Sequence, residues 1–271
     1  MLPRRIGINA DRNFFSEPTE EILKVIAEAG FDAVFTLFDP LEGCDEIESH
    51  HFAEEAAKNG LYFECVHGPF AHINDIWKEG EDGDAMLGRL CACVDFCAAA
   101  SVPYAVVHLS SGKKPPRIND LGNARFDALV DLAIKRNVTL AFENQRILSN
   151  LACVFEYYKD VDNVRFCWDV GHEKCFAQGR EYMPLFGDRL VYTHIHDNYC
   201  EDNGDKHLIP FDGKIDFEKT AKTLRESGFS GTLTLETLPE NSDVYNGISL
   251  REYYRKAYAA ALKLRNMVDG E

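Results

Sequence analysis

Six successive strand-like stretches of this chain each finish on a histidine or a carboxylate, and loop-type residues follow each of them directly. One such ending would mean little. Six in a row, separated by helix-like segments, indicate a ring of strands whose C-terminal ends converge on one point. In a (β/α)8 barrel the chemistry lies at that end of the strands. The stretches cover residues 61–67, 104–108, 139–143, 164–169, 191–194 and 232–236, and they end on His67, His108, Glu143, Asp169, His194 and Glu236.

The rest of the chain continues this alternation. Two further strands are expected at 5–9 and 33–37. Helices are expected at 19–29, 45–59, 86–100, 119–136, 151–159, 181–185, 217–227 and 250–267. The strands are apolar on both faces, as parallel strands covered by helices must be. No linker rich in Gly, Ser or Pro interrupts the pattern. We therefore predict an α/β fold, a single (β/α)8 TIM barrel spanning 1–271. The alternative is a doubly wound open sheet, which would not need ligands at the ends of so many consecutive strands.

Composition narrows the classes of partner and compartment. The formal net charge is −16, which opposes binding to a phosphate backbone, so no nucleic-acid partner is expected. No apolar run approaches the ~20 residues of a membrane span, and no apolar signal segment follows the first arginines. The nine cysteines have no paired spacing and are expected to be reduced thiols. These features predict a cytoplasmic protein without a membrane partner.

Four of the strand-end residues form a candidate metal site. Glu143, Asp169, His194 and Glu236 supply three carboxylates and one imidazole, a set that suits Mn²⁺, Mg²⁺, Co²⁺ or Zn²⁺. A buried, ionised Glu is costly unless it is paired or bound to a metal. The alternative for each glutamate is a salt bridge to a neighbouring base such as Arg146.

Other polar residues surround this set. A tight turn at Gly171 is expected to fold His172 back over Asp169, as a ligand or as a donor to a substrate oxygen. His196 follows the seventh strand and is a candidate for orienting a ligand or binding substrate. Further metal or substrate ligands could come from the third and fourth strands and from the loop after the seventh, at His67, His108, Asp205 and His207.

Two loops have open interpretations. Lys114 and Arg146, in the loops after the fourth and fifth strands, are candidates for binding a substrate phosphate, with solvated loop charge as the alternative. The segment 68–84 contains Phe70, Ile73, Ile76 and Trp77, and is either an apolar lid that excludes water or a surface for helix packing.

At these residues the chain resembles the xylose-isomerase-like TIM-barrel superfamily, which includes sugar phosphate isomerases and epimerases, inosose dehydratases, ketose 3-epimerases and the endonuclease IV type of AP endonuclease (family 2). The similarity extends over nearly the whole chain. Its carriers are His67-Gly68-Pro69-Phe70, Val107-His108, Phe142-Glu143-Asn144, Trp168-Asp169-Val170-Gly171-His172, His194-Ile195-His196-Asp197-Asn198, His207-Leu208-Ile209-Pro210, Gly213-Lys214-Ile215-Asp216-Phe217 and Leu235-Glu236.

The resemblance implies two ligand sets. In the ketose epimerases, one metal is held by residues matching Glu143, Asp169, His194 and Glu236; the two glutamates form the acid/base pair, and the residue matching His172 contacts substrate. Endonuclease IV holds three zinc ions with nine ligands, whose types match His67, His108, Glu143, Asp169, His172, His194, Asp205, His207 and Glu236. One departure concerns substrate orientation, because the arginine that the epimerases place after the seventh strand is replaced here by the stretch Asn198-Tyr199-Cys200.

The resulting expectation is a metal-dependent sugar or sugar phosphate isomerase or epimerase. It would act on a small sugar or polyol through an enediolate, with Glu143 and Glu236 as acid and base and His172 at the substrate. The alternatives are an AP endonuclease with a trinuclear zinc site, an inosose-type dehydratase and a non-catalytic metal-binding barrel. Formation of a homo-oligomer is left open.

Overall fold

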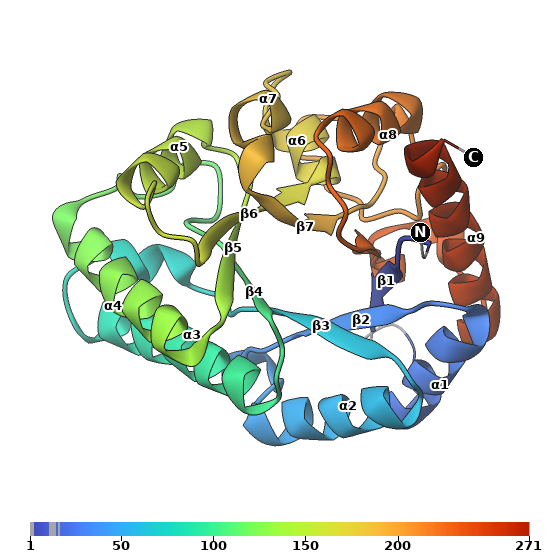
Figure 1. The fold of residues 1–271 in the computed structure, drawn as a ribbon, viewed down its shortest axis with the longest axis horizontal. Coiled ribbons are helices and arrows are strands. Elements are labelled where there is room, and N and C mark those ends of the chain that lie inside the picture. The colour runs from blue at the N-terminus through green and yellow to red at the C-terminus, as the bar shows by residue number, and fades with distance from the viewer. Residues whose placement is uncertain (1–2, 11–14, 16, 271) are drawn as a thin grey trace. The chain divides into compact units, whose positions relative to one another are not determined.

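The structure is a computed structural model and describes residues 3–10, 15 and 17–270. Its strands are β1 (Ile6–Asn9), β2 (Ala33–Leu37), β3 (Tyr62–His67), β4 (Tyr104–Val107), β5 (Thr139–Glu143), β6 (Val164–Asp169), β7 (Leu190–His194) and β8 (Leu233–Leu235). They form one eight-stranded sheet in the order β7-β6-β5-β4-β3-β2-β1-β8 (Figure 1).

The two ends of this order meet. Ile195, directly after β7, bridges Leu235 of β8 in the parallel sense. The Ile195 amide donates to the Thr234 carbonyl at 2.9 Å, and the Glu236 amide donates to the Ile195 carbonyl at 3.1 Å. The sheet therefore closes on itself, and the predicted (β/α)8 barrel fold is confirmed.

The helices in the described part of the chain are α1 (Thr19–Ala29), α2 (Glu46–Lys58), α3 (Glu81–Ala99), α4 (Asp120–Arg136), α5 (Leu148–Tyr157), α6 (Val170–Phe176), α7 (Met183–Phe186), α8 (Phe217–Glu226) and α9 (Leu250–Asp269). Short 3-10 segments add Pro40–Glu42, Ile73–Trp77, Gly187–Arg189, Pro239–Asn241 and Asp243–Tyr245. No helix among the described residues is both long and apolar enough to cross a membrane.

The chain divides into two compact units. Unit 1 comprises residues 1–35, 52–63 and 168–271. In it β1 pairs in parallel with β2 and with β8, and α9 packs against α1 and α8 along the edge drawn in blue and red in Figure 1. The ring of Phe15 packs on Tyr253 and Tyr254 of α9, with centroids 5.5 and 6.2 Å away. Aromatic packing thus holds α9 in the core of this unit.

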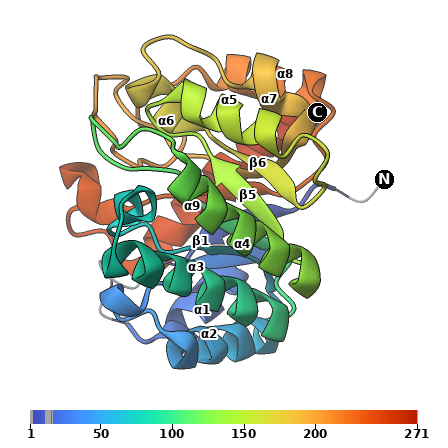
Figure 2. The ribbon, with the colours of Figure 1, turned by 90° about the vertical axis from the view of Figure 1, so that its left-hand side faces the viewer.

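Unit 2 comprises residues 36–51 and 64–167. Here β3, β4, β5 and β6 pair in parallel, and α3 lies beside α4 (Figure 2). Trp77 contacts Phe126 of α4 at 5.3 Å, and Phe126 contacts Phe142 of β5 at 5.9 Å. These rings join the helix layer to the strands beneath it.

The segment 68–84 packs against helices. Ile73, Ile76 and Trp77 are buried, and the Trp77 indole donates to the Leu109 carbonyl at 2.7 Å. Arg125 of α4 donates to the carbonyl of Ile76 at 2.9 Å. A segment bound in this way serves as a packing surface, which leaves Phe70 as its exposed apolar residue.

Several elements match the predicted ranges, among them α1, β2, β5 and β6. The prediction of one helix after each strand is wrong after β6. Both α6 and α7 follow this strand, and 170–172 form the first turn of α6 instead of a tight glycine turn. Asp169 caps α6 by accepting a hydrogen bond from the His172 amide. A helix of seven residues that contains a glycine is too short for its apolar period to be visible in sequence.

Two helices show larger differences from their predicted ranges. The third helix begins at Glu81 rather than at 86, because an acidic first turn extends the apolar run toward the N-terminus. The fifth helix covers Leu148–Tyr157 rather than 151–159. At the site, β4 ends at Val107 and β8 at Leu235, so His108 and Glu236 follow their strands directly.

Candidate metal centre

Unit 1 brings together three of the four predicted metal ligands. Asp169 ends β6, His194 ends β7 and Glu236 follows β8. The Nδ1 atom of His194 lies 3.4 Å from Oε2 of Glu236. Asp169 and His194 are completely buried, and only 13% of the Glu236 side chain is exposed. Carboxylates buried this deeply beside an imidazole form a donor set that fits a divalent cation.

The ring of His194 is held by an aromatic residue of β2. Phe35 stacks on it with a centroid distance of 4.9 Å and an interplanar angle of 20°. Tyr192 of β7 contacts the same imidazole edge-on at 5.6 Å. The sequence reasoning missed Phe35, because an apolar residue in a buried strand carries no signal that it contacts a ligand.

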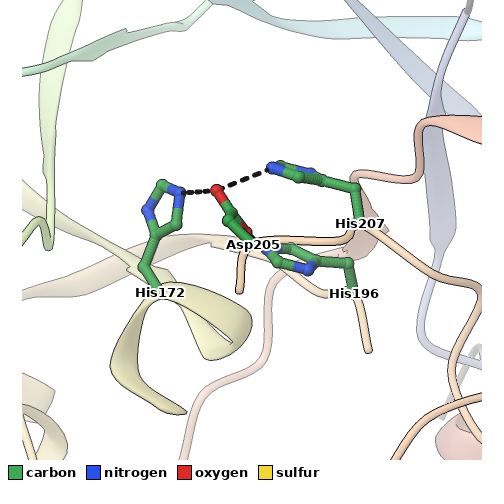
Figure 3. A group of neighbouring side chains, drawn as sticks. All are labelled: His172, His196, Asp205 and His207. Carbon is green, nitrogen blue, oxygen red and sulfur yellow. Dashed lines mark hydrogen bonds and ion pairs between the residues drawn. The ribbon is translucent and has the colours of Figure 1, made fainter. Parts of the chain in front are cut away.

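A second group of donors surrounds Asp205 (Figure 3). The Nε2 atoms of His172 and His207 both lie 3.2 Å from Oδ2 of Asp205. The ring of His196 is stacked on that of His207 at 3.9 Å and 13°. Four ligand atoms, one each from His172, His196, Asp205 and His207, lie within 4.8 Å of one another, close enough to hold a cation.

The tautomer of His207 constrains this group. Its Nδ1 lies 3.0 Å from the Glu236 carbonyl, which can only accept, so Nδ1 carries a proton. Nε2 faces the carboxylate of Asp205 and therefore either carries a second proton or binds a cation. Burial would lower the pKa of His207, but the charge of Asp205 and its hydrogen bond outweigh this and raise the pKa to about 10. Whether Nε2 is protonated or binds a cation, a positive charge lies beside Asp205.

Asp205 itself remains ionised. Burial would raise its pKa, but the charges of His207 and His172 and their hydrogen bonds hold the pKa well below its usual range. Among the described residues, Oδ1 of Asp205 and Nε2 of His196 are buried without a hydrogen-bond partner of good geometry. Buried polar atoms of this kind usually have a partner, and the donor chemistry here fits a divalent cation.

Asp197 anchors the loop that carries Asp205 and His207. Its Oδ1 accepts hydrogen bonds from the amides of Asn198 and Ile215, at 2.8 and 3.0 Å. Its Oδ2 accepts from the amides of Phe211 and Gly213, at 3.0 and 2.8 Å. Burial raises the pKa of Asp197, and these four donors act in the opposite direction. One carboxylate thus fixes both ends of the loop.

Unit 2 contains a group of polar side chains around Glu143, the last residue of β5. The Nε2 atom of His108 lies 2.6 Å from Oε2 of Glu143, and Gln145 donates to the same oxygen at 2.7 Å. The ring of His67 contacts that of His108 edge-on at 4.8 Å. The sequence reasoning missed Gln145, although its position two residues after Glu143 gives it the same parity along the chain.

The two basic residues proposed for a substrate phosphate are also in unit 2. Lys114 is exposed in the loop after β4, and Arg146 is half-buried in the loop after β5.

Similar proteins were found by sequence and by structure. An uncharacterized protein of Sinorhizobium fredii, y4fM, is 33% identical over 231 residues, which cover 80% of this chain and 67% of that protein. The uncharacterized protein MJ1311 of Methanocaldococcus jannaschii is 25% identical over 135 residues, which cover 46% of this chain and 45% of that protein.

Solved structures with the same fold include sugar epimerases. D-psicose 3-epimerase with D-tagatose from Clostridium cellulolyticum H10 has a TM-score of 0.76 and 16% identity, covering 97% of this chain and 99% of that one. The 3-keto-D-glucoside 4-epimerase YcjR of E. coli has a TM-score of 0.72 and 16% identity, covering 96% of this chain and 99% of that one. Residues 23–261 match the family described as "Xylose isomerase-like TIM barrel". The chain therefore belongs to the xylose isomerase-like TIM barrel family.

Proposed function

We propose that this chain is a divalent-metal-dependent isomerase or epimerase of a small sugar, sugar phosphate or keto-polyol. The observation that carries the proposal is the buried set of Asp169, His194 and Glu236 at the ends of β6, β7 and β8, in which His194 and Glu236 approach to 3.4 Å. Glu143, buried at the end of β5, is the fourth ligand in this proposal. The ion would be Mn²⁺, Mg²⁺, Co²⁺ or Zn²⁺.

The proposed chemistry needs a cation, an acid/base pair and residues that orient them. When bound, the cation supplies Lewis acidity toward the substrate's oxygens. One of Glu143 and Glu236 removes the proton from the carbon next to the carbonyl, and the other returns a proton at the same carbon or at its neighbour. His172, whose Nδ1 lies 3.6 Å from Oδ2 of Asp169, donates to a substrate oxygen. Gln145 and His108 keep Glu143 oriented through its Oε2.

Solvent isotope exchange tests this proposal. The protein, loaded with Mn²⁺, would be incubated in heavy water with D-tagatose, D-psicose, D-fructose, their phosphates and an inosose. We expect deuterium on the carbon next to the carbonyl of at least one of these compounds, detected by NMR. Product that forms without solvent deuterium would indicate an internal hydride shift and refute the two-glutamate mechanism. Release of water from the inosose would favour the dehydratase alternative, which shares the first proton abstraction.

A nuclease with three zinc ions is the second candidate function. The group of His172, Asp205 and His207 supports it, since these residues match the additional ligands that the resemblance to endonuclease IV implies. The net charge of −16 opposes it, because binding to a phosphate backbone depends on the opposite charge. Metal-dependent incision of a duplex with an abasic site at physiological salt would establish this candidate and displace the first.

A further inference from the structure

The backbone that carries Glu236 is bound by the side chain of an asparagine in β1. Asn9 is the last residue of β1, and it is buried. Its Nδ2 donates to the Thr237 carbonyl at 2.9 Å, and its Oδ1 accepts from the Thr237 amide at 2.8 Å. The donor and the acceptor of one side chain thus bind both backbone groups of the residue that follows Glu236.

This pair of hydrogen bonds begins where the strand pairing ends. The register of β1 and β8 finishes with Ile8 opposite Leu235. Thr237 lies beyond that last pair and is buried, so its amide and carbonyl need other partners. The side chain of Asn9 supplies both partners and extends the edge of β1 past the end of the ladder.

The same segment is bound on its other side as well. The Glu236 amide donates to the Ile195 carbonyl at 3.1 Å, and the Glu236 carbonyl lies 3.0 Å from Nδ1 of His207. The Leu238 amide donates to the His207 carbonyl at 3.0 Å. In an extended backbone the peptide groups of successive residues point to opposite sides. The residue between these two therefore faces β1, where the asparagine binds it.

A backbone held from both sides determines where the Glu236 side chain leaves it. Side chains of an extended segment stand roughly perpendicular to the direction of the hydrogen bonds. The direction of the Cα–Cβ bond is fixed with the peptide groups on either side of it. Along this direction the Glu236 carboxylate reaches His194, with Oε2 3.4 Å from Nδ1. Rotation of the peptide after Glu236 would carry the carboxylate away from that imidazole.

We propose that Asn9 is a positioning residue, which directs the Glu236 carboxylate at the cation by fixing the peptide groups of Thr237. The inference rests on the proposed metal site. An asparagine suits this role because it offers one donor group and one acceptor, whereas leucine has a similar shape and neither group. Partners that orient a ligand change metal affinity by about 10–100-fold, and Asn9 acts through the backbone, so we expect about tenfold.

Two substitutions of Asn9 test this role. Asn9→Leu removes both hydrogen-bonding groups at similar size, and Asn9→Ala removes them without any risk of overpacking should the Leu variant fail to fold. Calorimetric titration of the metal-stripped full chain with Mn²⁺ should show a loss of affinity of about tenfold in each. Hydrogen exchange at the Thr237 amide should speed up in both variants, because its acceptor is gone.

A matched control separates positioning from general stability. Asn163 directly precedes β6, and its Nδ2 donates to the Val138 carbonyl at 2.9 Å. It therefore makes a bond of the same kind at the opposite end of a strand. Asn163→Leu should lower the urea midpoint as Asn9→Leu does, and it should leave Mn²⁺ affinity unchanged.

A double substitution shows whether the effect passes through Glu236. In a Glu236→Gln background the charged ligand is already lost, so Asn9→Leu should cause no further loss of Mn²⁺ affinity. A role in general stability would weaken binding equally in both backgrounds. If Glu236→Gln abolishes binding altogether, the comparison with Asn163→Leu decides between the two roles.

The outcomes distinguish this inference from the proposed function. Wild-type protein that binds no Mn²⁺ overturns the metal site itself. Wild-type protein that binds Mn²⁺ while the Asn9 variants bind it within about threefold of that affinity overturns only the role of Asn9, since an orienting partner has a larger effect. An equal loss in Asn163→Leu, or an equal loss with and without the Glu236 carboxylate, would overturn that role as well.

Discussion

The imidazole of His196 occupies the space that a side chain at Gly171 would need. The ring after β7 can therefore take this position only when residue 171 of α6 has no side chain. The backbone of Gly171 does not lie in the left-handed region. Its lack of a side chain is therefore explained by close approach of the ring and not by a turn. Glycine within a helix lowers stability relative to alanine. Here that cost is accepted because a Cβ atom would clash with the His196 ring.

We expect the effect of Gly171→Ala on the free energy of unfolding to change sign when the His196 ring is removed. In the wild type it should lower the free energy of unfolding by about 1–3 kcal/mol, the usual range for overpacking. In His196→Ala the space is vacant, so the same change should raise the free energy of unfolding by up to about 1 kcal/mol. Urea denaturation of the four proteins measures this.

Gly88→Ala is a matched control, because Gly88 lies in α3 with open space around its Cα. It should be stabilising in both backgrounds. Identical effects of Gly171→Ala with and without His196 would contradict the steric account.

Asp197→Asn should loosen the loop that carries Asp205 and His207. The side-chain NH2 group of Asn would face two of the four backbone amides that now donate hydrogen bonds to the carboxylate. The negative charge would be lost as well. Hydrogen bonds to a buried charged group contribute about 1.5–3 kcal/mol each, so we expect a loss of at least ~3 kcal/mol in the free energy of unfolding. Hydrogen exchange should speed up at the amides of 211, 213 and 215. Asp202→Asn, at an exposed position of the same loop, should change neither quantity.

The pair of Asp205 and His207 should make the stability of metal-free protein depend on pH. The pKa of His207 is raised from 6.5 to about 10. Its contribution to the free energy of unfolding is therefore complete below pH 6.5 and is lost as the pH rises toward 10. The pKa of Asp205 is lowered, so its contribution is complete above about 4 and is lost as pH falls further. The stability difference between wild type and His207→Gln should therefore be largest between about pH 4 and 6.5.

Urea denaturation in a chelator at pH 5.5, 7.5 and 9.5 checks this window. A bound divalent ion should show the opposite trend, because it competes with protons for the imidazole and binds better as pH rises. A difference between the two proteins that stays constant over these pH values would contradict the ion-pair account.

Metal content should separate the two candidate functions. We expect about one tightly held divalent ion per chain, lost in Asp169→Asn and in His194→Gln. Elemental analysis of carefully purified protein measures it. About three zinc ions per chain would favour the nuclease, whose second and third ions would need the residues around Asp205 and His108.

Glu143→Gln and Glu236→Gln should each slow turnover by at least about 100-fold when the variant is shown to be loaded with metal. Each change removes a ligand charge along with the base, so the rate can be interpreted only after metal content has been measured. Gln145→Leu should have a smaller effect, since it removes an orienting donor and leaves the carboxylate in place. Near wild-type rates in both metal-loaded glutamate variants would eliminate them as the acid/base pair.

The repeating strand–helix unit and the chemistry of the strand ends could be predicted from sequence, because both are local. Strands such as β5 and β6 were correctly bounded because an apolar run stops abruptly at Glu143 or Asp169, and both the run and its polar end are local properties. The alternation of strand and helix predicts parallel strands, since parallel neighbours need crossover connections. The closed barrel, rather than a doubly wound open sheet, was indicated by the ligand-type residues that end six consecutive strands.

Which polar side chains lie next to one another depends on long-range contacts and could not be predicted from local sequence. Asp205 and His207 lie in a loop without any periodic pattern. They reach His172 because the Asp197 carboxylate accepts hydrogen bonds from the amides of 211, 213 and 215, which lie 14–18 residues further along the chain. The helix α6 forms from seven residues with a glycine among them, because Asp169 caps it and its side chains are buried against neighbours far away in sequence. The place of the His196 ring over Gly171 depends on contacts between segments 25 residues apart (171 and 196), and local propensity contains no information about such contacts.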